Sequence, residues 1–305
     1  MRSRYTFISE SVTEGHPDKL CDQISDAIVG RTLRQDPRAR VVAECAVSTS
    51  IVFLSVKTRG HAHVDVAETA REVIRRVGYT EGRFDARSCS IMTSIDDLGD
   101  APHGGVAEPP ARAEDQATVF GFACRQTPAF MPLPIWLAHR LAQRLAAARR
   151  SGALPYLAPD GKTQVGVEFE GMLPVRVQSV TVVASQRTLA EPAPERLERD
   201  LREAVIEPVF AEESLRPDDG TRIAINPEGP FAKGGPSNHA GLTGRKNAVD
   251  AYGGFARHGG AALSGKDVSR VDKVGAYAAR YAAKNVVAAG LAEQCEVALS
   301  YSIGL

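Results

Sequence analysis

The segment 14–19, with the sequence EGHPDK, constrains the fold of this 305-residue chain more than any other. Proline fixes its own backbone angle near the helical value and has no N–H to satisfy, so it favours the first turn of a helix. The apolar residues that follow Pro17 recur at helical spacing; they are Leu20, Ile24, Ala27 and Ile28. The sequence therefore predicts a helix that begins at Pro17, with His16 and Asp18 at its N-terminus.

A helix N-terminus of this kind favours anions, because its free backbone N–H groups and the helix dipole both attract negative charge. Asp18 is a suitable ligand for a hard cation, and His16 and Lys19 could face phosphate oxygens. The same residues also fit an ordinary helix start with a charged first turn. This segment alone leaves both interpretations open.

The composition excludes several classes of function. The chain has 37 basic and 37 acidic residues, so its net charge is zero, which argues against a nucleic-acid or membrane-surface partner recruited by bulk charge. Five scattered cysteines without a CxxC motif indicate reduced thiols rather than a disulfide framework or a zinc site. We find no signal-like N-terminus and no apolar run of membrane-spanning length, so we expect a cytoplasmic protein without a membrane partner.

Strand and helix patterns alternate along the chain without a G-x-G-x-x-G motif, which predicts a mixed α/β fold of the α+β type. The expected strands are Val41–Val47, Ile51–Val56, Cys89–Ile95, Ala117–Cys124, Gln164–Glu170, Val175–Val183, Thr221–Asn226 and Glu296–Ile303. The further expected helices are Val64–Val77, Ile135–Arg150, Glu195–Val209 and Val268–Ala289. Residues 96–113 are rich in Asp, Gly, Pro and Ala and are expected to form a long functional loop.

Residues 260–267, GAALSGKD, nearly fit the phosphate-binding P-loop pattern. The position that should supply a hydroxyl to Mg²⁺ carries Asp267, and the strand–loop–helix context is missing, so we reject a true P-loop. A glycine-rich approach with Lys266 at a phosphate remains compatible with the residues. Further cations and carboxylates stand beside Gly or Pro in expected loops and suit a polyanion with a divalent metal; they are Lys19, Lys162, Lys233, Arg245, Lys246, Asp18, Asp115, Asp160 and Asp272.

Four ordered motifs resemble the S-adenosylmethionine synthetases (methionine adenosyltransferases). They are FISESVTEGHPDK at 7–19, GLTGRK at 241–246, GGFARHGG at 253–260, and SGKD at 264–267 followed by Val271-Asp272. The resemblance runs from about Tyr5 to Gly304. It implies three similar βαββαβ units around a pseudo-threefold axis: residues 1–100, 113–231 and 232–305, with 96–113 as a gate loop.

The resemblance also implies a role for individual residues. His16 would stabilise negative charge on the departing triphosphate, with Lys162, Arg245 and Lys266 as further catalytic residues that hold it. The remaining implied ATP-binding residues are Lys19, Asp115, Asp160, Phe231 and Lys246. Asp18 and Asp272 would ligate two Mg²⁺ ions, and Glu44 would ligate K⁺. A homodimer with active sites at the subunit interface is implied, and pairing of dimers into tetramers is left open.

The chain departs from the family pattern where the acceptor methionine should bind. Lys57 stands in place of the acid that contacts the methionine ammonium, and His239 stands in place of an aspartate. The gate loop is shorter and lacks its glutamine, and residues 112–117, RAEDQA, have lost the glycines of the corresponding family motif. Family members also continue beyond Leu305, so the chain would be a C-terminally shortened member, either a compact variant or a part of a longer chain.

These observations predict an ATP-dependent adenosyltransferase, in which the acceptor substrate attacks C5′ of ATP as the nucleophile and triphosphate is released. The triphosphate is then hydrolysed to diphosphate and phosphate. A neutral thioether would need no general base, so the chemistry can depend on leaving-group stabilisation and in-line positioning. Methionine is the family acceptor. The alternatives are a different acceptor (anionic or intramolecular), water, or a non-catalytic ATP-binding partner subunit.

Overall fold

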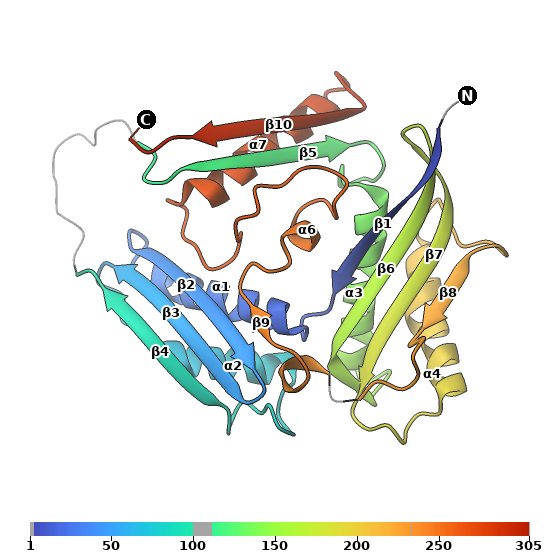
Figure 1. Ribbon diagram of the computed structural model, residues 1–305, viewed down its shortest axis with the longest axis horizontal. Coiled ribbons are helices and arrows are strands. Elements are labelled where there is room, and N and C mark those ends of the chain that lie inside the picture. The colour runs from blue at the N-terminus through green and yellow to red at the C-terminus, as the bar shows by residue number, and fades with distance from the viewer. Residues whose placement is uncertain (1–2, 100–111, 233, 305) are drawn as a thin grey trace.

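The computed structural model describes residues 3–99, 112–232 and 234–304, and Figure 1 shows their arrangement. Most of the expected loop at 96–113 lies outside the described residues. The strands are β1 (Arg4–Val12), β2 (Arg40–Ser48), β3 (Ile51–Arg59), β4 (Ser90–Asp97), β5 (Ala117–Cys124), β6 (Leu157–Glu170), β7 (Leu173–Gln186), β8 (Arg222–Ile225), β9 (Gly241–Leu242) and β10 (Gln294–Tyr301). The helices are α1 (Pro17–Gln35), α2 (Val66–Val77), α3 (Leu133–Arg150), α4 (Pro194–Leu201), α5 (Glu207–Ala211), α6 (Asn247–Asp250) and α7 (Val271–Ala288).

The strands form three sheets, with the orders β1-β6-β7-β8, β4-β3-β2-β9 and β10-β5. In the view of Figure 1 the helices α1 and α2 lie behind the second sheet, and α3 lies behind the first. Most strand pairs are antiparallel, and β3–β4 and β7–β8 are parallel. The mixed α+β fold expected from the sequence is thus confirmed.

Each sheet joins strands that are distant in sequence. The N-terminal strand β1 pairs with β6, β2 pairs with β9, and β5 pairs with β10. The β1–β6 pairing joins the expected units 1–100 and 113–231, and the β5–β10 pairing joins the units 113–231 and 232–305. The β2–β9 pairing joins the first expected unit to the third. The three consecutive units and their threefold similarity remain predictions.

Helix α1 forms where the sequence predicted it. The side chain of His16 caps the helix by accepting a hydrogen bond from the backbone N–H of Asp18, and Pro17 occupies the first turn. The spaced residues Leu20, Ile24 and Ile28 are at most 1% exposed and pack in one core with β2, β3 and α2. This burial fixes the N-terminus of α1 against the second sheet.

Buried and exposed residues alternate along strands β2 and β3, as the hairpin prediction requires. Val52, Leu54 and Val56 face the helices, while Ile51 and Phe53 lie on the opposite, open face. A second core forms between α3 and the first sheet, where residues such as Leu137 and Phe169 are fully buried. Both sheets therefore have one face covered by helices and one face open.

The expected helix Glu195–Val209 is interrupted in the structure. A π-helical turn at Arg202–Ile206 separates α4 from α5. Proline at position 208 has no N–H and its ring conflicts with the carbonyl four residues earlier, that of Ala204. The wider π turn relieves this conflict, and Arg144 Nε donates a hydrogen bond to the Ala204 carbonyl at 2.8 Å.

Lys266 does not lie in a P-loop. Lys266 forms an isolated β-bridge with Val42 of β2, and helix α7 begins only at Val271. The rejection of a P-loop is therefore confirmed, and the glycine-rich segment before Lys266 instead runs beside the edge of β2. This path brings the C-terminal part of the chain to the N-terminal sheet.

Candidate active site

His16 is a buried, neutral imidazole at the start of α1. Its side chain is 3% exposed, and burial lowers its pKa to about 4, although Asp160 and Asp18 nearby work in the opposite direction. Because Nδ1 accepts the hydrogen bond from the Asp18 N–H at 3.2 Å, the proton of the neutral ring lies on Nε2. His16 is therefore a hydrogen-bond donor at neutral pH rather than a cation.

Asp18 lies within a cage of positive charge. Its Oδ1 is 2.9 Å from Arg245 Nε and accepts a hydrogen bond from the backbone N–H of Leu242, and its Oδ2 is 3.1 Å from Lys246 Nζ. Burial opposes ionisation, but the hydrogen bonds from Leu242 and Lys246 lower the pKa of Asp18 below its usual value. The carboxylate is therefore ionised and holds two cations beside His16.

His239 and Asp160 complete the surroundings of His16. The two imidazole rings have their centroids 5.0 Å apart, and His239 Nε2 lies 3.5 Å from Asp160 Oδ2. Asp160 comes from β6 and accepts a hydrogen bond from the backbone N–H of Gly235 at 2.8 Å. Three distant segments thus meet at one point, where a buried carboxylate lies close to two histidines.

Lys19 is held by two carboxylates, Asp22 and Asp250. Burial works against its charged form, but these partners raise the pKa of Lys19. Asp22 also accepts a hydrogen bond from the backbone N–H of Gly244 at 2.8 Å, which ties the loop that carries Arg245 to α1. Lys19 thus links α1 to α6.

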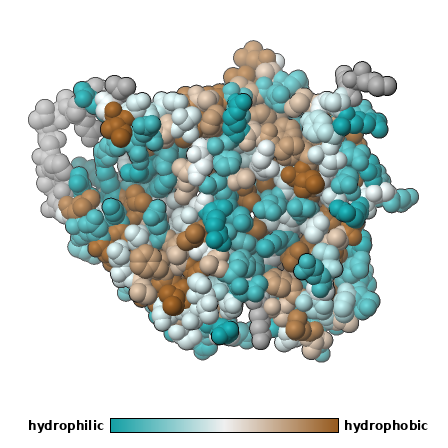
Figure 2. Space-filling model, in the orientation of Figure 1, coloured by the Kyte–Doolittle hydropathy of each residue, from teal (hydrophilic) through white to brown (hydrophobic). Residues whose placement is uncertain are grey.

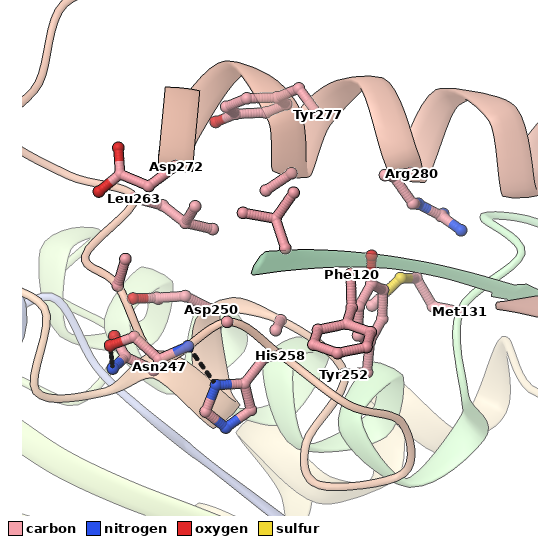
Figure 3. Close-up of a pocket in the computed structure, with 16 residues that line it drawn as sticks. Phe120, Met131, Asn247, Asp250, Tyr252, His258, Leu263, Asp272, Tyr277 and Arg280 are labelled. Atoms are coloured by element: carbon pink, nitrogen blue, oxygen red, sulfur yellow. Dashed lines mark hydrogen bonds between the residues drawn. The ribbon is translucent and has the colours of Figure 1, made fainter. Parts of the chain in front are cut away.

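Lys266 forms an ion pair with Asp272 at the N-terminus of α7. Asp272 also lines a pocket of about 190 Å³ between α7, β5 and the loop after α6. Figure 3 shows this pocket with Tyr277 and Arg280 on the helix above it and Asn247, Asp250 and His258 below. His16 and Asp18 are not among the residues that line it, so this pocket adjoins the charged cage without containing it.

The other residues expected at the site lie farther out. Asp115 pairs with Arg270 at 2.8 Å, and Phe231 is half-buried with its carbonyl accepting a hydrogen bond from the Gln186 N–H. Lys162 of β6 is exposed on the open face of the first sheet.

Glu44 and Lys57 are exposed on the open face of the second sheet, on β2 and β3. The described chain therefore brings His239 to His16 but leaves Lys57 on another surface. Lys233 lies outside the described residues.

The sequence interpretation missed three residues that organise this region: Asp22, Asp250 and Arg270. Asp22 stands three positions after Lys19, a spacing that places the two side chains on one helix face and could have revealed it. Arg270 stands two positions before Asp272, but nothing in that spacing indicates Asp115 as its partner. The Lys19–Asp250 pair joins residues from opposite ends of the chain and left no sequence signal.

This geometry defines a class of site. Cations and buried carboxylates alternate around a helix N-terminus, next to a neutral histidine that can donate a hydrogen bond. Such a site can accept a polyanion on Arg245 and Lys246 and a hard divalent cation on the carboxylates. It suits an α+β enzyme that stabilises charge on a phosphate leaving group.

Comparison with known families agrees with this class. The N-terminal, central and C-terminal domain profiles of S-adenosylmethionine synthetase match residues 4–99, 111–231 and 233–305. An S-adenosylmethionine synthase from Thermosynechococcus vestitus is 48% identical over 99% of this chain and 78% of the relative. The corresponding protein from Synechococcus sp. (strain JA-3-3Ab) is 50% identical over 98% of this chain and 77% of its own length.

The chain therefore belongs to the S-adenosylmethionine synthetase family. It is a transferase of the methionine adenosyltransferase type, as the four sequence motifs predicted. Among the described residues, no helix is both long enough and apolar enough to cross a bilayer.

Proposed function

We propose that this chain transfers the adenosyl group of ATP to methionine. The observation that carries the proposal is the buried Asp18 with Arg245 and Lys246 on its two oxygens, directly beside neutral His16. The nucleophile's lone pair would form a bond to C5′ while the C5′–O5′ bond breaks, and its electrons would pass to the triphosphate. A methionine thioether is neutral, so no proton has to be removed from it.

The cations around Asp18 and Asp272 are assigned to the triphosphate. Arg245, Lys246 and Lys266 are now paired with carboxylates, and each can exchange that partner for a phosphate oxygen. Lys162, on the open face of the first sheet, is also assigned to the triphosphate. We further assign Arg245 to the second step, in which the retained triphosphate is hydrolysed to diphosphate and phosphate.

His16 is assigned to the leaving oxygen. Because its ring is neutral and its Nε2 carries the proton, it can donate a hydrogen bond to O5′ as negative charge develops there. Its position is fixed by burial and by the cap hydrogen bond, so little reorganisation is needed when the bond breaks.

The site residues also fit the metal ions that the family implies. Asp18 Oδ2 is buried and lies 3.1 Å from Lys246 Nζ, and Asp272 is the second carboxylate beside a cation. These oxygen ligands would hold Mg²⁺, which neutralises triphosphate charge when bound. Glu44 is assigned to K⁺, and the support for it is the family resemblance alone.

The nucleotide itself is assigned to residues around the cage. Asp160 and Asp115 would line its site, Phe231 would stack on the adenine, and Lys19 would reach the phosphates once it releases Asp22 or Asp250. Among these residues Asp160 lies closest to His16 and His239, since one of its carboxylate oxygens is 3.5 Å from His239 Nε2 and it belongs to the same cluster as His16.

A different acceptor is a second candidate because of His239 and Lys57. His239 places an imidazole beside Asp160, where the family pattern has an acid, and Lys57 reverses the charge expected for binding an ammonium group. Both changes favour an anionic acceptor, or a protic one such as water. Under this candidate the phosphate machinery is unchanged and only the nucleophile differs.

A homodimer with active sites between subunits is part of the proposal. The open face of the second sheet exposes Ile51, Phe53, Met92 and Leu242, each more than 40% exposed. Figure 2, in the orientation of Figure 1, shows hydrophobic side chains among hydrophilic ones over these strands. Covering this face with a second copy would bury its apolar side chains and could bring Lys57 to a partner's site; tetramers would require a second contact.

The proposal places the enzyme in the cytoplasm, since all five cysteines are unpaired and four of them are buried. It also retains the division of the sequence into units 1–100, 113–231 and 232–305, with the gate loop at 96–113. ATP and a small acceptor are its only proposed partners besides a second subunit.

Mass spectrometry of a reaction with the protein, ATP, Mg²⁺ and K⁺ tests the proposal, run with and without methionine. S-adenosylmethionine that appears only with methionine is the expected result. Release of diphosphate and phosphate without S-adenosylmethionine would instead favour the second candidate. If ATP is left unchanged under both conditions, the chain is not an adenosyltransferase acting alone.

A further inference from the structure

The point where His16, Asp160 and His239 meet has the chemistry of a second kind of metal site. Each of the three side chains offers one ligand atom, and these atoms lie within 4.8 Å of one another. The residues come from the start of α1, from β6 and from the loop before β9, so the cluster does not arise from local sequence spacing. It differs from the Asp18 and Asp272 carboxylates because two of its three ligands are nitrogen.

Two polar atoms of this cluster have no hydrogen-bond partner among the residues that the structure describes. They are Asp160 Oδ1, on a side chain only 1% exposed, and His239 Nε2. Leaving a buried carboxylate oxygen without a partner costs free energy, and nearly all such atoms in folded proteins are satisfied. A cation between the three side chains would satisfy both atoms at once.

The ligand set determines which cations fit. Two imidazoles and one carboxylate favour borderline divalent ions such as Zn²⁺ or Co²⁺, whereas Mg²⁺ favours oxygen ligands in an octahedral arrangement. Three protein ligands also leave an open coordination position, as in zinc sites that bind water or a substrate.

The groups behind the ligands support the same cation. Asp160 is oriented by the Gly235 N–H, which donates to its Oδ2 at 2.8 Å. His16 Nδ1 lies 3.2 Å from the backbone nitrogen of Asp18 and 3.7 Å from Asp18 Oδ2, so a metal on Nε2 would move the ring proton to Nδ1 and replace the cap hydrogen bond with a contact to that carboxylate. A carboxylate behind a ligating histidine is the usual arrangement in zinc sites, where it fixes the tautomer and orients the ring.

We propose that His16, Asp160 and His239 bind one borderline divalent metal ion of the Zn²⁺ class, and that this ion inhibits the reaction with ATP. The inhibitory part rests on the proposed function, because it requires that His16 donate its Nε2 proton to the leaving oxygen. A metal on Nε2 removes that donor and occupies the space in front of it. The binding part depends only on the three side chains.

Titration of the metal-free protein with Co²⁺, followed by visible absorption, tests the binding. Co²⁺ replaces Zn²⁺ in such sites and absorbs according to its coordination. We expect one equivalent to bind with the spectrum of mixed nitrogen and oxygen ligands, and the substitution His239→Asn to weaken binding by at least about tenfold. His139→Asn is the matched control, since His139 is another partly buried histidine outside the cluster.

The two histidine variants separate the outcomes. Absence of Co²⁺ binding to the wild type, or equal affinity in wild type and His239→Asn, would overturn the proposal. His239 has a side chain 30% exposed, so its replacement should preserve the fold, and an unchanged melting temperature verifies this. His16→Asn provides a second ligand variant and should weaken Co²⁺ binding in the same way.

An activity measurement then tests inhibition separately from binding. ATP consumption in excess Mg²⁺ should fall as Zn²⁺ fills the site and should recover after Zn²⁺ is removed by a chelator and Mg²⁺ is restored. Co²⁺ binding without any loss of ATP consumption would overturn the inhibitory part. A protein that binds Co²⁺ at His239 but never consumes ATP would refute the proposed function while the metal site stands.

Discussion

The backbone of Gly241 lies directly against the carbonyl group of Pro17. A Cβ atom at position 241 would come closer than 3.0 Å to the Pro17 carbonyl and to the backbone nitrogen of Asp18. Gly241 begins β9, so this approach fixes the distance between the second sheet and the N-terminus of α1. It also places His239 next to His16, because both residues lie within two positions of the contact.

Substitution of Gly241 by alanine should therefore separate β9 from α1. We expect it to lower the free energy of unfolding by about 1–3 kcal/mol, since the clash involves backbone atoms that cannot turn aside. Turnover of ATP should fall more than stability predicts, because His16, Asp18 and Arg245 depend on the same contact. Urea denaturation and a turnover assay on the same preparation measure both effects.

Substitution of Gly30 in helix α1 should have the opposite effect on stability. Gly30 lies inside α1, and a Cβ there would meet only Arg34 Nη2, at 3.6 Å. Gly30→Ala should raise the free energy of unfolding by about 0.5–1 kcal/mol, because glycine is a poor residue for a helix interior. A destabilised Gly30→Ala variant would show that helix α1 is packed differently from this description.

Two neighbouring arginines of α3 share the partner Glu14 and should differ in their contribution to stability. Arg149 is 11% exposed and also donates a hydrogen bond to the Val77 carbonyl at the end of α2, while Arg150 is 53% exposed. Arg149→Ala should cost about 2–3 kcal/mol, and Arg150→Ala less than about 1 kcal/mol. Thermal unfolding of the two variants compares them directly, and equal costs would contradict the prediction.

His139 should make the stability depend on pH. Burial, together with nearby Lys19, lowers its pKa to about 4, and its Nδ1 lies 2.8 Å from Ser11 Oγ. The folded pKa is below that of the unfolded chain, so the unfolded state binds the proton first as the pH falls. Stability should therefore be complete above about pH 6.5 and decline toward about pH 4, by at most about 1.4 kcal/mol per pH unit from this residue.

Replacing His139 by asparagine should remove part of that slope. His16 has a similarly lowered pKa and should account for a second part. Urea denaturation at several pH values between about 7 and 5 gives the slope for each protein. An identical slope in wild type and His139→Asn would show that this histidine does not titrate between the two states as expected.

The double substitution Lys57→Glu and His239→Asp should increase methionine-dependent turnover if the acceptor site has changed. Each replacement restores an acid where the family pattern has one, and a reversed short-range charge is worth about 1 kcal/mol in water and several in a partly buried site. A gain of about tenfold or more in kcat/KM for methionine is expected. No gain would mean that methionine binds without these contacts or that other residues exclude it.

The sequence predicted helix α1 and strand β5 well because local signals and tertiary packing agree there. Pro17 starts α1, and the bounds expected for Ala117–Cys124 match the structure. The first half of β6 was missed, since Pro159, Asp160 and Gly161 are residues that usually end strands. Strand β1 was also missed, because its buried positions are the polar Ser9 and Ser11 together with Val12, so no alternation of apolar and polar residues marks it.

The charged cage was predicted by residue type but not by partner. The sequence identified Asp18, Arg245 and Lys246 of the cage and, apart from it, Lys266 and Asp272, and the structure adds how they pair. The family resemblance assigned His16, Asp160 and His239 to the active site, but residue spacing gave no sign that they meet, because the approach of His239 to His16 depends on the contact between Gly241 and Pro17. Long-range backbone approaches of this kind cannot be inferred from spacing alone.

The pairing of β1 with β6, β2 with β9 and β5 with β10 has a consequence for the newly made chain on the ribosome. Strand β2 is synthesised long before β9, and β5 long before β10. Two sheets can therefore be completed only after residues on the C-terminal side have been synthesised. The helical layers can pack early, whereas the loop bearing Arg245 and His239 arrives with β9. A growing chain thus brings His239 and Arg245 to His16 and Asp18 only when its last sheets close.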